Sequence, residues 1–246
     1  MPRRPLRRIE ARVKAGILSP RWTPGIQNDI FYGMKKVAVI GANGQLGSDI
    51  VKVFSASYWR VFLLQHRNIE ISEPRSVARA LNRLKPNIVI NTAAFHDTVA
   101  CEREPNRAYQ VNALGVRNLS HWCLSHGSVL VHFSTDYVFG GDLSRRRPYR
   151  ETDPVSPQSS YAISKLAGEF FVQTLLKQYF LIRTSGLYGE AGSSVKGSNF
   201  VTNRLQQAKR KQSIYMVKDQ ILSPTWTKNL AQNLEMLLKT NHYGLY

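Results

Sequence analysis

The chain has 246 residues, of which 34 are basic and 16 acidic, so its net charge at neutral pH is +18. This length allows one well-packed core, and its two cysteines lack CxxC spacing, which excludes a disulfide framework and a cysteine-based zinc site. The apolar runs are far shorter than the roughly 20 residues that cross a bilayer, so we expect a soluble cytoplasmic protein without membrane contact.

Residues 1–33 form a basic leader whose only acidic residues are Glu10 and Asp29. It has no periodic apolar face and lacks the apolar core of a secretory signal. We expect a disordered tail, or an extension upstream of a true start at Met34, and exclude it from the fold. The positive charge favours anionic partners, but no nucleic-acid module or interleaving of aromatic and basic residues occurs, so we expect no binding to nucleic acid.

From Met34 onward, short β-branched runs alternate with segments of helical length. The strands are nearly continuously apolar, as in parallel sheets covered on both faces. This alternation predicts an α/β fold with a doubly wound, Rossmann-like parallel sheet over residues 34–185. The predicted strands are 36–40, 60–64, 87–91, 129–134 and 179–185; the predicted helices are 45–57, 74–85, 102–125 and one that begins near residue 159.

After residue 185 the alternation weakens into a Gly- and Ser-rich loop, followed by predicted helices at 199–211 and 226–240. We assign residues 186–246 to a smaller substrate lobe. The sequence ends at "HYGLY" without a closing helix. We therefore expect this lobe to be partial, with a C-terminal segment missing.

A glycine pattern lies between the first predicted strand and helix. Gly41, Gly44 and Gly47 follow a GxxGxxG order in "VAVIGANGQLGSDIV". The first permits a tight turn, the second lets the backbone approach a pyrophosphate, and the third allows the helix to pack closely on the strand. Exposed N–H groups at the helix N-terminus attract negative charge. The pattern favours a dinucleotide cofactor over the alternative, a turn and helix cap without a ligand.

The end of the second strand bears on the choice between NAD and NADP. Gln65 stands where an acid would bind the ribose of NAD, and His66 and Arg67 beside it suit a 2′-phosphate. We therefore favour NADP and keep NAD open. Glu70 is a further candidate, on the adenine side of the site.

Tyr161 and Lys165 lie four residues apart in "SSYAISKLAGE", so on a helix they share one face. An adjacent ammonium would lower the pKa of a phenol from its ordinary value of about 10. Thr135, with Ser134, follows the fourth strand at the end where open sheets bind ligands, and its hydroxyl could polarise a carbonyl. The alternative is a Tyr and a Lys on a solvated helix face.

Six motifs occur in order: "GANGQLG", "NTAAF", "STDYVFGG", "YAISKLAGE", "IRTSGLYG" and "DQILSPT". With them, residues 34–246 resemble the extended short-chain dehydrogenase/reductase superfamily and, more narrowly, the dTDP-4-dehydrorhamnose reductase family. The resemblance implies an oxidoreductase that passes hydride from NADPH or NADH to the 4-keto group of a dTDP-linked 6-deoxyhexose. Such an enzyme serves dTDP-rhamnose and polysaccharide precursor synthesis.

The resemblance also implies residue roles. Tyr161 would donate the proton, Lys165 would bind the nicotinamide ribose and lower the phenol pKa, and Thr135 would bind the carbonyl oxygen. Asn112 would either brace the site or cap a helix. The implied substrate contacts are Asp136, Tyr137 and Gly186; the implied cofactor contacts are Gly44, Gln45 and Leu46 at the pyrophosphate and Ala93 and Ala94 along the wall.

Two positions depart from the family pattern. Gly186 stands where members often carry a Trp that packs on the sugar, and His96 stands where a small hydroxyl residue is common. Because Gly186 cannot pack on the sugar, the identity of the sugar substrate is left open, and His96 leaves one cofactor contact open. The basic loop 145–150 either attracts the substrate diphosphate or is simply solvated.

Two other functions remain open at this point. A nucleotide-binding regulatory subunit like that of methionine adenosyltransferase resembles the same family, and so does a nucleotide-sugar epimerase or dehydratase. The latter usually needs further acid or base residues, for which only Asp136 is available. We assign no metal ligands, and the sequence leaves a homodimer open.

Overall fold

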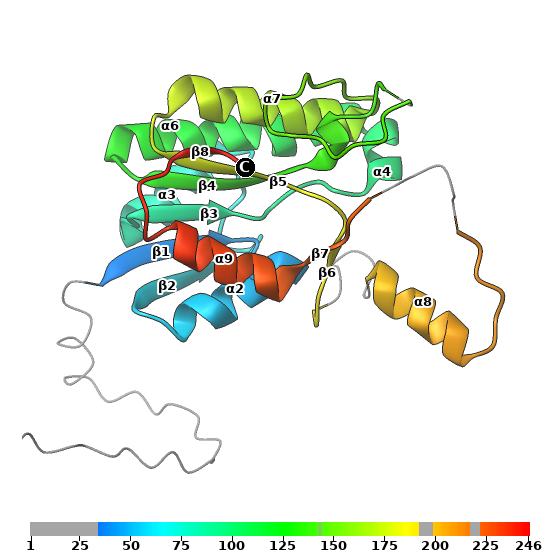
Figure 1. Cartoon of the computed structure of the whole chain (residues 1–246). Coiled ribbons are helices and arrows are strands. Elements are labelled where there is room, and N and C mark those ends of the chain that lie inside the picture. The colour runs from blue at the N-terminus through cyan, green and yellow to red at the C-terminus, as the bar shows by residue number, and fades with distance from the viewer. Residues whose placement is uncertain (1–33, 143, 192–198, 217–221) are drawn as a thin grey trace, which may run out of the picture. The chain divides into compact units, whose positions relative to one another are not determined.

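The computed structural model describes residues 34–142, 144–191, 199–216 and 222–246 (Figure 1). Met34–Tyr246 forms one compact unit. The predicted disordered leader lies outside the described residues, as does part of the Gly- and Ser-rich loop. No helix among the described residues is long and apolar enough to span a membrane.

Six strands form one parallel sheet in the order β2-β1-β3-β4-β5-β8. The five predicted strands are confirmed, and each end lies within one residue of its prediction. The chain order reverses between β1 and β3, which is the place where open α/β sheets bind ligands beyond their strand ends. The strands are β1 (Lys35–Ile40), β2 (Trp59–Leu64), β3 (Ile88–Asn91), β4 (Val129–Thr135), β5 (Tyr179–Thr184) and β8 (Gly244–Leu245).

Helices cover both faces of this sheet (Figure 1). On one face, α2 (Gln45–Ser55) and α9 (Thr227–Leu237) bury Phe54 and Leu234 against the strands. On the other, α3 (Pro74–Leu84), α6 (Val116–His126) and α7 (Ser160–Leu175) bury Leu81, Leu119 and Val172. Apolar contacts on both faces explain why the strands are continuously apolar. The doubly wound, Rossmann-like fold is thus confirmed.

The single helix predicted at 102–125 is wrong. The segment is divided into α4 (Thr98–Arg103), α5 (Pro105–Tyr109), a π-helical turn η1 (Gln110–Gly115) and α6. Pro105 begins α5, and Glu104 before it adopts φ −127° and ψ 58°, outside the helical region. A proline lacks a backbone N–H and disfavours helical geometry in the preceding residue, which breaks the helix there.

One part of the segment after β5 forms a second, two-stranded sheet, and another part joins the main sheet and its core. β6 (Leu187–Tyr188) pairs with β7 (Thr225–Trp226) in a separate two-stranded sheet, and α8 (Phe200–Lys209) lies between them in the chain. In contrast, β8 pairs with β5 and α9 joins the core against α2. Residues 227–246 therefore contribute to the main fold, and the separate lobe stays a prediction for residues 186–226.

Candidate active site

The glycine turn after β1 leaves no room for side chains at two of its positions. Gly41 has φ +78°, and a Cβ there would lie 2.6 Å from Thr92 Oγ1. A Cβ on Gly47 would lie 2.1 Å from the carbonyl oxygen of Gly41. The predicted tight turn and the predicted close packing at Gly47 are therefore confirmed. Gly44, at the N-cap of α2, provides no side-chain acceptor for the first amides of that helix.

The other two residues predicted at the pyrophosphate differ in orientation. The side-chain Nε2 of Gln45 is buried and has no hydrogen-bond partner within the described part of the chain. Leu46 is 4% exposed and its side chain packs in the core. Only the backbone of Leu46 can thus reach a ligand, whereas the amide of Gln45 is an uncommitted donor beside the turn.

The residues predicted to read the ribose lie on the turn after β2. Gly41 N–H donates to Leu64 O at 2.8 Å, which places this turn next to the glycine turn. His66 Nε2 lies 2.7 Å from Glu70 Oε2, and the other oxygen of Glu70 accepts bonds from the N–H and hydroxyl of Ser72. Burial alone would raise the pKa of Glu70, but these partners hold it below its ordinary value. Both basic side chains, His66 and Arg67, are exposed.

The segment after β3 forms a wall against the glycine turn. Thr92 Oγ1 donates to the carbonyl of Ile40 at 2.8 Å, and the N–H of Ala93 donates to Asn91 Oδ1 at 3.1 Å. Ala93 and Ala94 are half-buried at this wall, and their contact with a cofactor stays a prediction, while His96 is exposed. The structure thus brings the glycine turn and the two alanines together.

The predicted catalytic side chains meet at the carboxyl end of β4. Tyr161, in the first turn of α7, neighbours Thr135, whose hydroxyl acts to lower the pKa of the phenol. Its ring makes an edge contact with that of Tyr137, with centroids 5.9 Å apart. Thr135 Oγ1 donates to Asp136 Oδ1 at 3.3 Å and accepts the N–H of Tyr137 at 3.1 Å. Four residues predicted from two motifs that are distant in the sequence therefore form one cluster.

The environment of this cluster changes the acidity of its members. Burial raises the pKa of Tyr161 to about 12; the neighbouring hydroxyl of Thr135 acts against this shift, and the charge of Asp136 adds to it. Burial also raises the pKa of Asp136, against the neighbouring hydroxyls of Ser185 and Thr135. The expectation that Lys165 makes the phenol unusually acidic is wrong for the chain by itself, because burial is the larger effect.

Lys165 points toward the sheet. It is 3% exposed, and its ammonium donates to the backbone carbonyl of Phe133 at 2.6 Å. Burial lowers its pKa to about 8, and Glu169 acts against the shift. Glu169 is itself completely buried and receives three hydrogen bonds from Arg183, at 3.1, 3.3 and 2.6 Å. No local sequence pattern signals this ion pair, because Glu169 on α7 and Arg183 on β5 are 14 positions apart.

Asn112 braces the helix of Tyr161. Its Nδ2 donates to Phe95 O at 2.9 Å and to Ser164 Oγ at 3.0 Å, and its Oδ1 accepts the N–H of Phe95 at 2.9 Å. Ser164 Oγ in turn donates to the carbonyl of Tyr161 at 2.8 Å. Of the two roles considered for Asn112, bracing fits these contacts. The π-helical turn η1 places it between the wall and α7.

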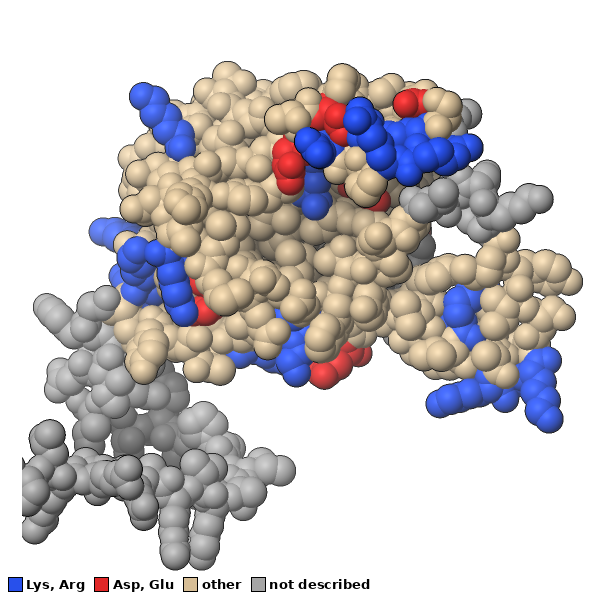
Figure 2. Space-filling model, in the orientation of Figure 1, with Lys and Arg blue, Asp and Glu red and all other residues tan. Residues whose placement is uncertain are grey.

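Gly186 and the basic loop 145–150 are the two remaining regions that the sequence predicted to face the substrate. Among the described residues, a Cβ on Gly186 would meet only Leu222 Cδ1, at 3.9 Å. Figure 2 shows basic side chains gathered, with acidic ones among them, over the loop that follows β4. Within it Arg145 is only 13% exposed, pairs with Asp153 and lies over the ring of Tyr149 at 4.0 Å. Arg145 therefore holds the loop together.

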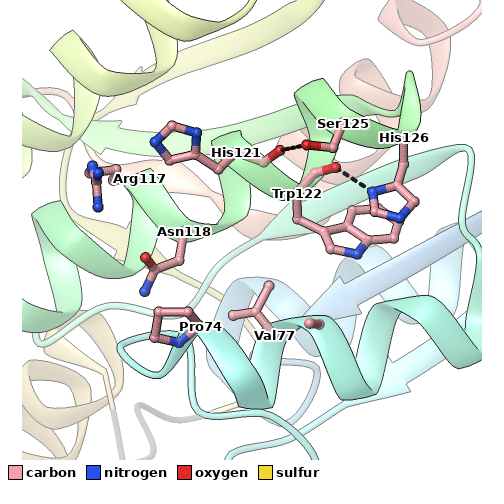
Figure 3. A pocket seen from close by; sticks show the side chains of 9 residues that line it. Pro74, Val77, Arg117, Asn118, His121, Trp122, Ser125 and His126 are labelled. Atoms are coloured by element: carbon pink, nitrogen blue, oxygen red, sulfur yellow. Dashed lines mark hydrogen bonds between the residues drawn. The ribbon is translucent and has the colours of Figure 1, made fainter.

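A surface hollow of about 320 Å³ lies elsewhere, between α3 and α6 (Figure 3). Its His126 stacks on Trp122 with ring centroids 4.1 Å apart and bonds the carbonyl of Trp122 at 2.8 Å. Trp122 donates from its indole to Asn82 at 2.8 Å. These polar groups bond to one another, and none of the predicted site residues lines this hollow.

Comparison with known proteins places the chain in a family. The RmlD substrate binding domain family matches residues 34–246. Spore coat polysaccharide biosynthesis protein SpsK of Bacillus subtilis is 40% identical over 199 residues, which cover 81% of this chain and 68% of that protein. A dTDP-4-dehydrorhamnose reductase of Aggregatibacter actinomycetemcomitans is 34% identical over 220 residues, covering 87% and 72%.

A solved structure agrees with this assignment. The dTDP-4-dehydrorhamnose reductase of Bacillus anthracis, crystallised in complex with NADP, superposes with a TM-score of 0.81 at 35% identity. The match covers 87% of this chain and 73% of that one. On its sequence, its doubly wound sheet and these similarities, the chain belongs to the dTDP-4-dehydrorhamnose reductase family.

Proposed function

We propose that the protein is an NADP-linked reductase of the 4-keto group of a dTDP-linked 6-deoxyhexose. It would act in the cytoplasm, in nucleotide-sugar and polysaccharide precursor synthesis, without a nucleic-acid partner. The observation that carries this proposal is that the phenol of Tyr161 neighbours the hydroxyl of Thr135 at the carboxyl end of β4, beside Asp136 and Tyr137. The names of the relatives support it, and the two cysteines, which are buried and free, suit a reducing compartment.

The residues at the place where the strand order reverses, between β1 and β3, fit a dinucleotide. Gly41 and Gly47 keep side chains out of the turn, and the buried Nε2 of Gln45 is an available donor. Gly44 and the backbone of Leu46 would complete the pyrophosphate contacts, with His66, Arg67 and Glu70 at the ribose and Ala93 and Ala94 along the wall. When bound, the reduced nicotinamide would supply the hydride. NAD remains the alternative cofactor.

Tyr161 would act as the proton donor. A pKa near 12 keeps its phenol protonated at neutral pH, as a donor must be, and an alkoxide formed on the sugar is a stronger base than a phenolate. Thr135 would hold the same oxygen, and the ammonium of Lys165 would stabilise negative charge in a buried site. Asp136, Tyr137 and Gly186 would face the sugar.

The test is turnover by the purified protein. We would follow oxidation of NADPH, and separately NADH, with a panel of dTDP-4-keto-6-deoxy sugars. Tyr161→Phe should lower kcat by about 10²- to 10⁴-fold, the usual range for loss of a general acid. Tyr58→Phe, at a site 89% exposed, should leave it unchanged. Tight NADPH binding without turnover of any sugar would instead favour the regulatory subunit, and exchange of sugar epimers without net oxidation would favour the epimerase.

We further propose a homodimer formed through α6 and α7. A groove of about 550 Å³ lies between these helices and α5, and Phe170 and Leu114 beside it are 55% and 43% exposed. Arg117 lies over the ring of Phe171 at 6.0 Å. A two-fold axis would pair this face with itself. Light scattering should then show a dimer that Phe170→Asp converts to a monomer and Tyr58→Asp does not; a monomeric wild type would refute it.

A further inference from the structure

A carboxylate from α4 binds the first residue of α7. Glu102 Oε1 accepts the N–H of Ser160 at 2.8 Å, and its Oε2 accepts the hydroxyl of Ser160 at 2.7 Å. The two residues are 58 positions apart in sequence. Ser160 is followed directly by Tyr161, so this pair of bonds lies at the backbone that carries the phenol.

These bonds complete the N-terminus of α7. The first N–H groups of a helix lack partners within it, and the positive end of the helix dipole favours a carboxylate. Ser159 Oγ accepts the N–H of Ala162 at 3.2 Å, and Glu102 satisfies that of Ser160. Glu102 is exposed, so its contact with α7 is made by hydrogen bonds at the rim of the site and not by packing in the core.

The same residue joins two parts of the site. Glu102 lies on α4, which directly follows the wall that contains Ala93 and Ala94. Asn112 makes a second, buried connection between Phe95 of this segment and Ser164 of α7. Glu102 thus fixes the first residue of α7, and Asn112 fixes the same helix one turn later, at Ser164. Together they fix the helix on both sides of Tyr161.

We propose that Glu102 is a positioning residue for Tyr161. It fixes the first turn of α7 so that the phenol stays beside Thr135, Asp136 and Tyr137 at the carboxyl end of β4. The proposal rests on the proposed reductase function. Errors of about 1 Å in the placement of a reacting group cost up to roughly 10²-fold in rate, so loss of this restraint acts mainly on kcat.

The chain offers a matched control two residues away. Glu104 is also an exposed acid, 50% exposed at its side chain, but it pairs with Arg107 of α5 at 3.2 Å. Glu102→Ala should lower kcat by about tenfold or more while the Kd for NADPH stays within about twofold of wild type. Glu102→Gln, which keeps one acceptor oxygen, should recover part of the loss, and Glu104→Ala should have no effect. An unchanged kcat in Glu102→Ala, an equal loss in Glu104→Ala, or an equal loss of NADPH affinity would overturn the proposal.

A second readout does not depend on turnover. In protein labelled with ¹³C-tyrosine, the ring signal of Tyr161 is identified by its absence in Tyr161→Phe. Glu102→Ala should shift or broaden that signal in the NADPH-bound protein, and Glu104→Ala should leave it in place. If the wild type reduces no sugar but the signal responds in this way, the proposed function fails and the positioning contact stands. If the signal is insensitive to Glu102→Ala, the contact has no effect on Tyr161 and the proposal is wrong.

Discussion

Lys165 donates a hydrogen bond of 2.6 Å from its ammonium to the backbone carbonyl of Phe133, which fastens α7 to β4 within the core. The side chain is almost completely buried there. A buried cation loses its hydration, so its proton is held less firmly than in water. Lys165 therefore titrates at a pH where a surface lysine does not.

This burial predicts how reduction depends on pH. With a pKa near 8, Lys165 is charged below that pH and neutral above it, while Tyr161, with a pKa near 12, stays protonated throughout. The kcat/KM for reduction should be level below the pKa of Lys165 and fall about tenfold per pH unit above it. Glu169 raises the pKa of Lys165, so Glu169→Gln should move the falling limb to lower pH. If the falling limb of kcat/KM stays at the same pH in Glu169→Gln, a group other than Lys165 controls it.

Two substitutions of Thr135 should distinguish the contribution of its hydroxyl to kcat from that of its shape. Thr135→Val removes the hydroxyl beside Tyr161 and its hydrogen bond to Asp136, and we expect kcat to fall by about 10²-fold, as for loss of one donor to a developing oxyanion. Thr135→Ser keeps the hydroxyl and should keep most of the activity. The hydroxyl also accepts the N–H of Tyr137, so thermal unfolding of both variants must be measured. Equal losses of kcat in Val and Ser variants would contradict the role.

A methyl group at Gly47 should disturb the cofactor turn. The added Cβ would lie 2.1 Å from the carbonyl oxygen of Gly41, which belongs to the backbone and cannot rotate away. We expect Gly47→Ala to lower the free energy of unfolding by about 1–3 kcal/mol and to weaken NADPH binding. Gly186→Ala is the control, because within the part of the chain that the structure describes its Cβ would meet only Leu222 Cδ1, at 3.9 Å. Similar effects of the two substitutions in urea unfolding and NADPH titration would argue against this account.

His132 should make the folded state sensitive to mild acid. It is completely buried, and burial together with the charge of Lys165 lowers its pKa well below 6.5. Below pH 6.5 the unfolded chain therefore binds a proton that the folded chain does not, so stability is lost as the pH falls. In urea unfolding, wild type should lose about 1.4 kcal/mol per pH unit relative to His132→Leu over this range. If the free energies of unfolding of wild type and His132→Leu change in parallel with pH, His132 does not contribute to the acid sensitivity.

The strands and the glycine turn could be predicted because their signals are local. Each of the five strands buries apolar side chains on both faces, and the sequence shows this directly as a short apolar run. Gly41 is required by its own positive φ, and the spacing to Gly47 brings the two together within one turn. Likewise, Tyr161 and Lys165 follow from the period of a single helix.

The sequence by itself determined the doubly wound fold, the glycine turn and the residue types of the site. Only the tertiary structure decided that burial raises the pKa of Tyr161 and lowers that of Lys165, because desolvation depends on what packs around a group. It also decided that Glu102 meets Ser160 and that Trp59 donates to Glu235, 176 residues away. Such contacts arise from chain segments that approach one another only when the sheet has formed, so no local pattern encodes them.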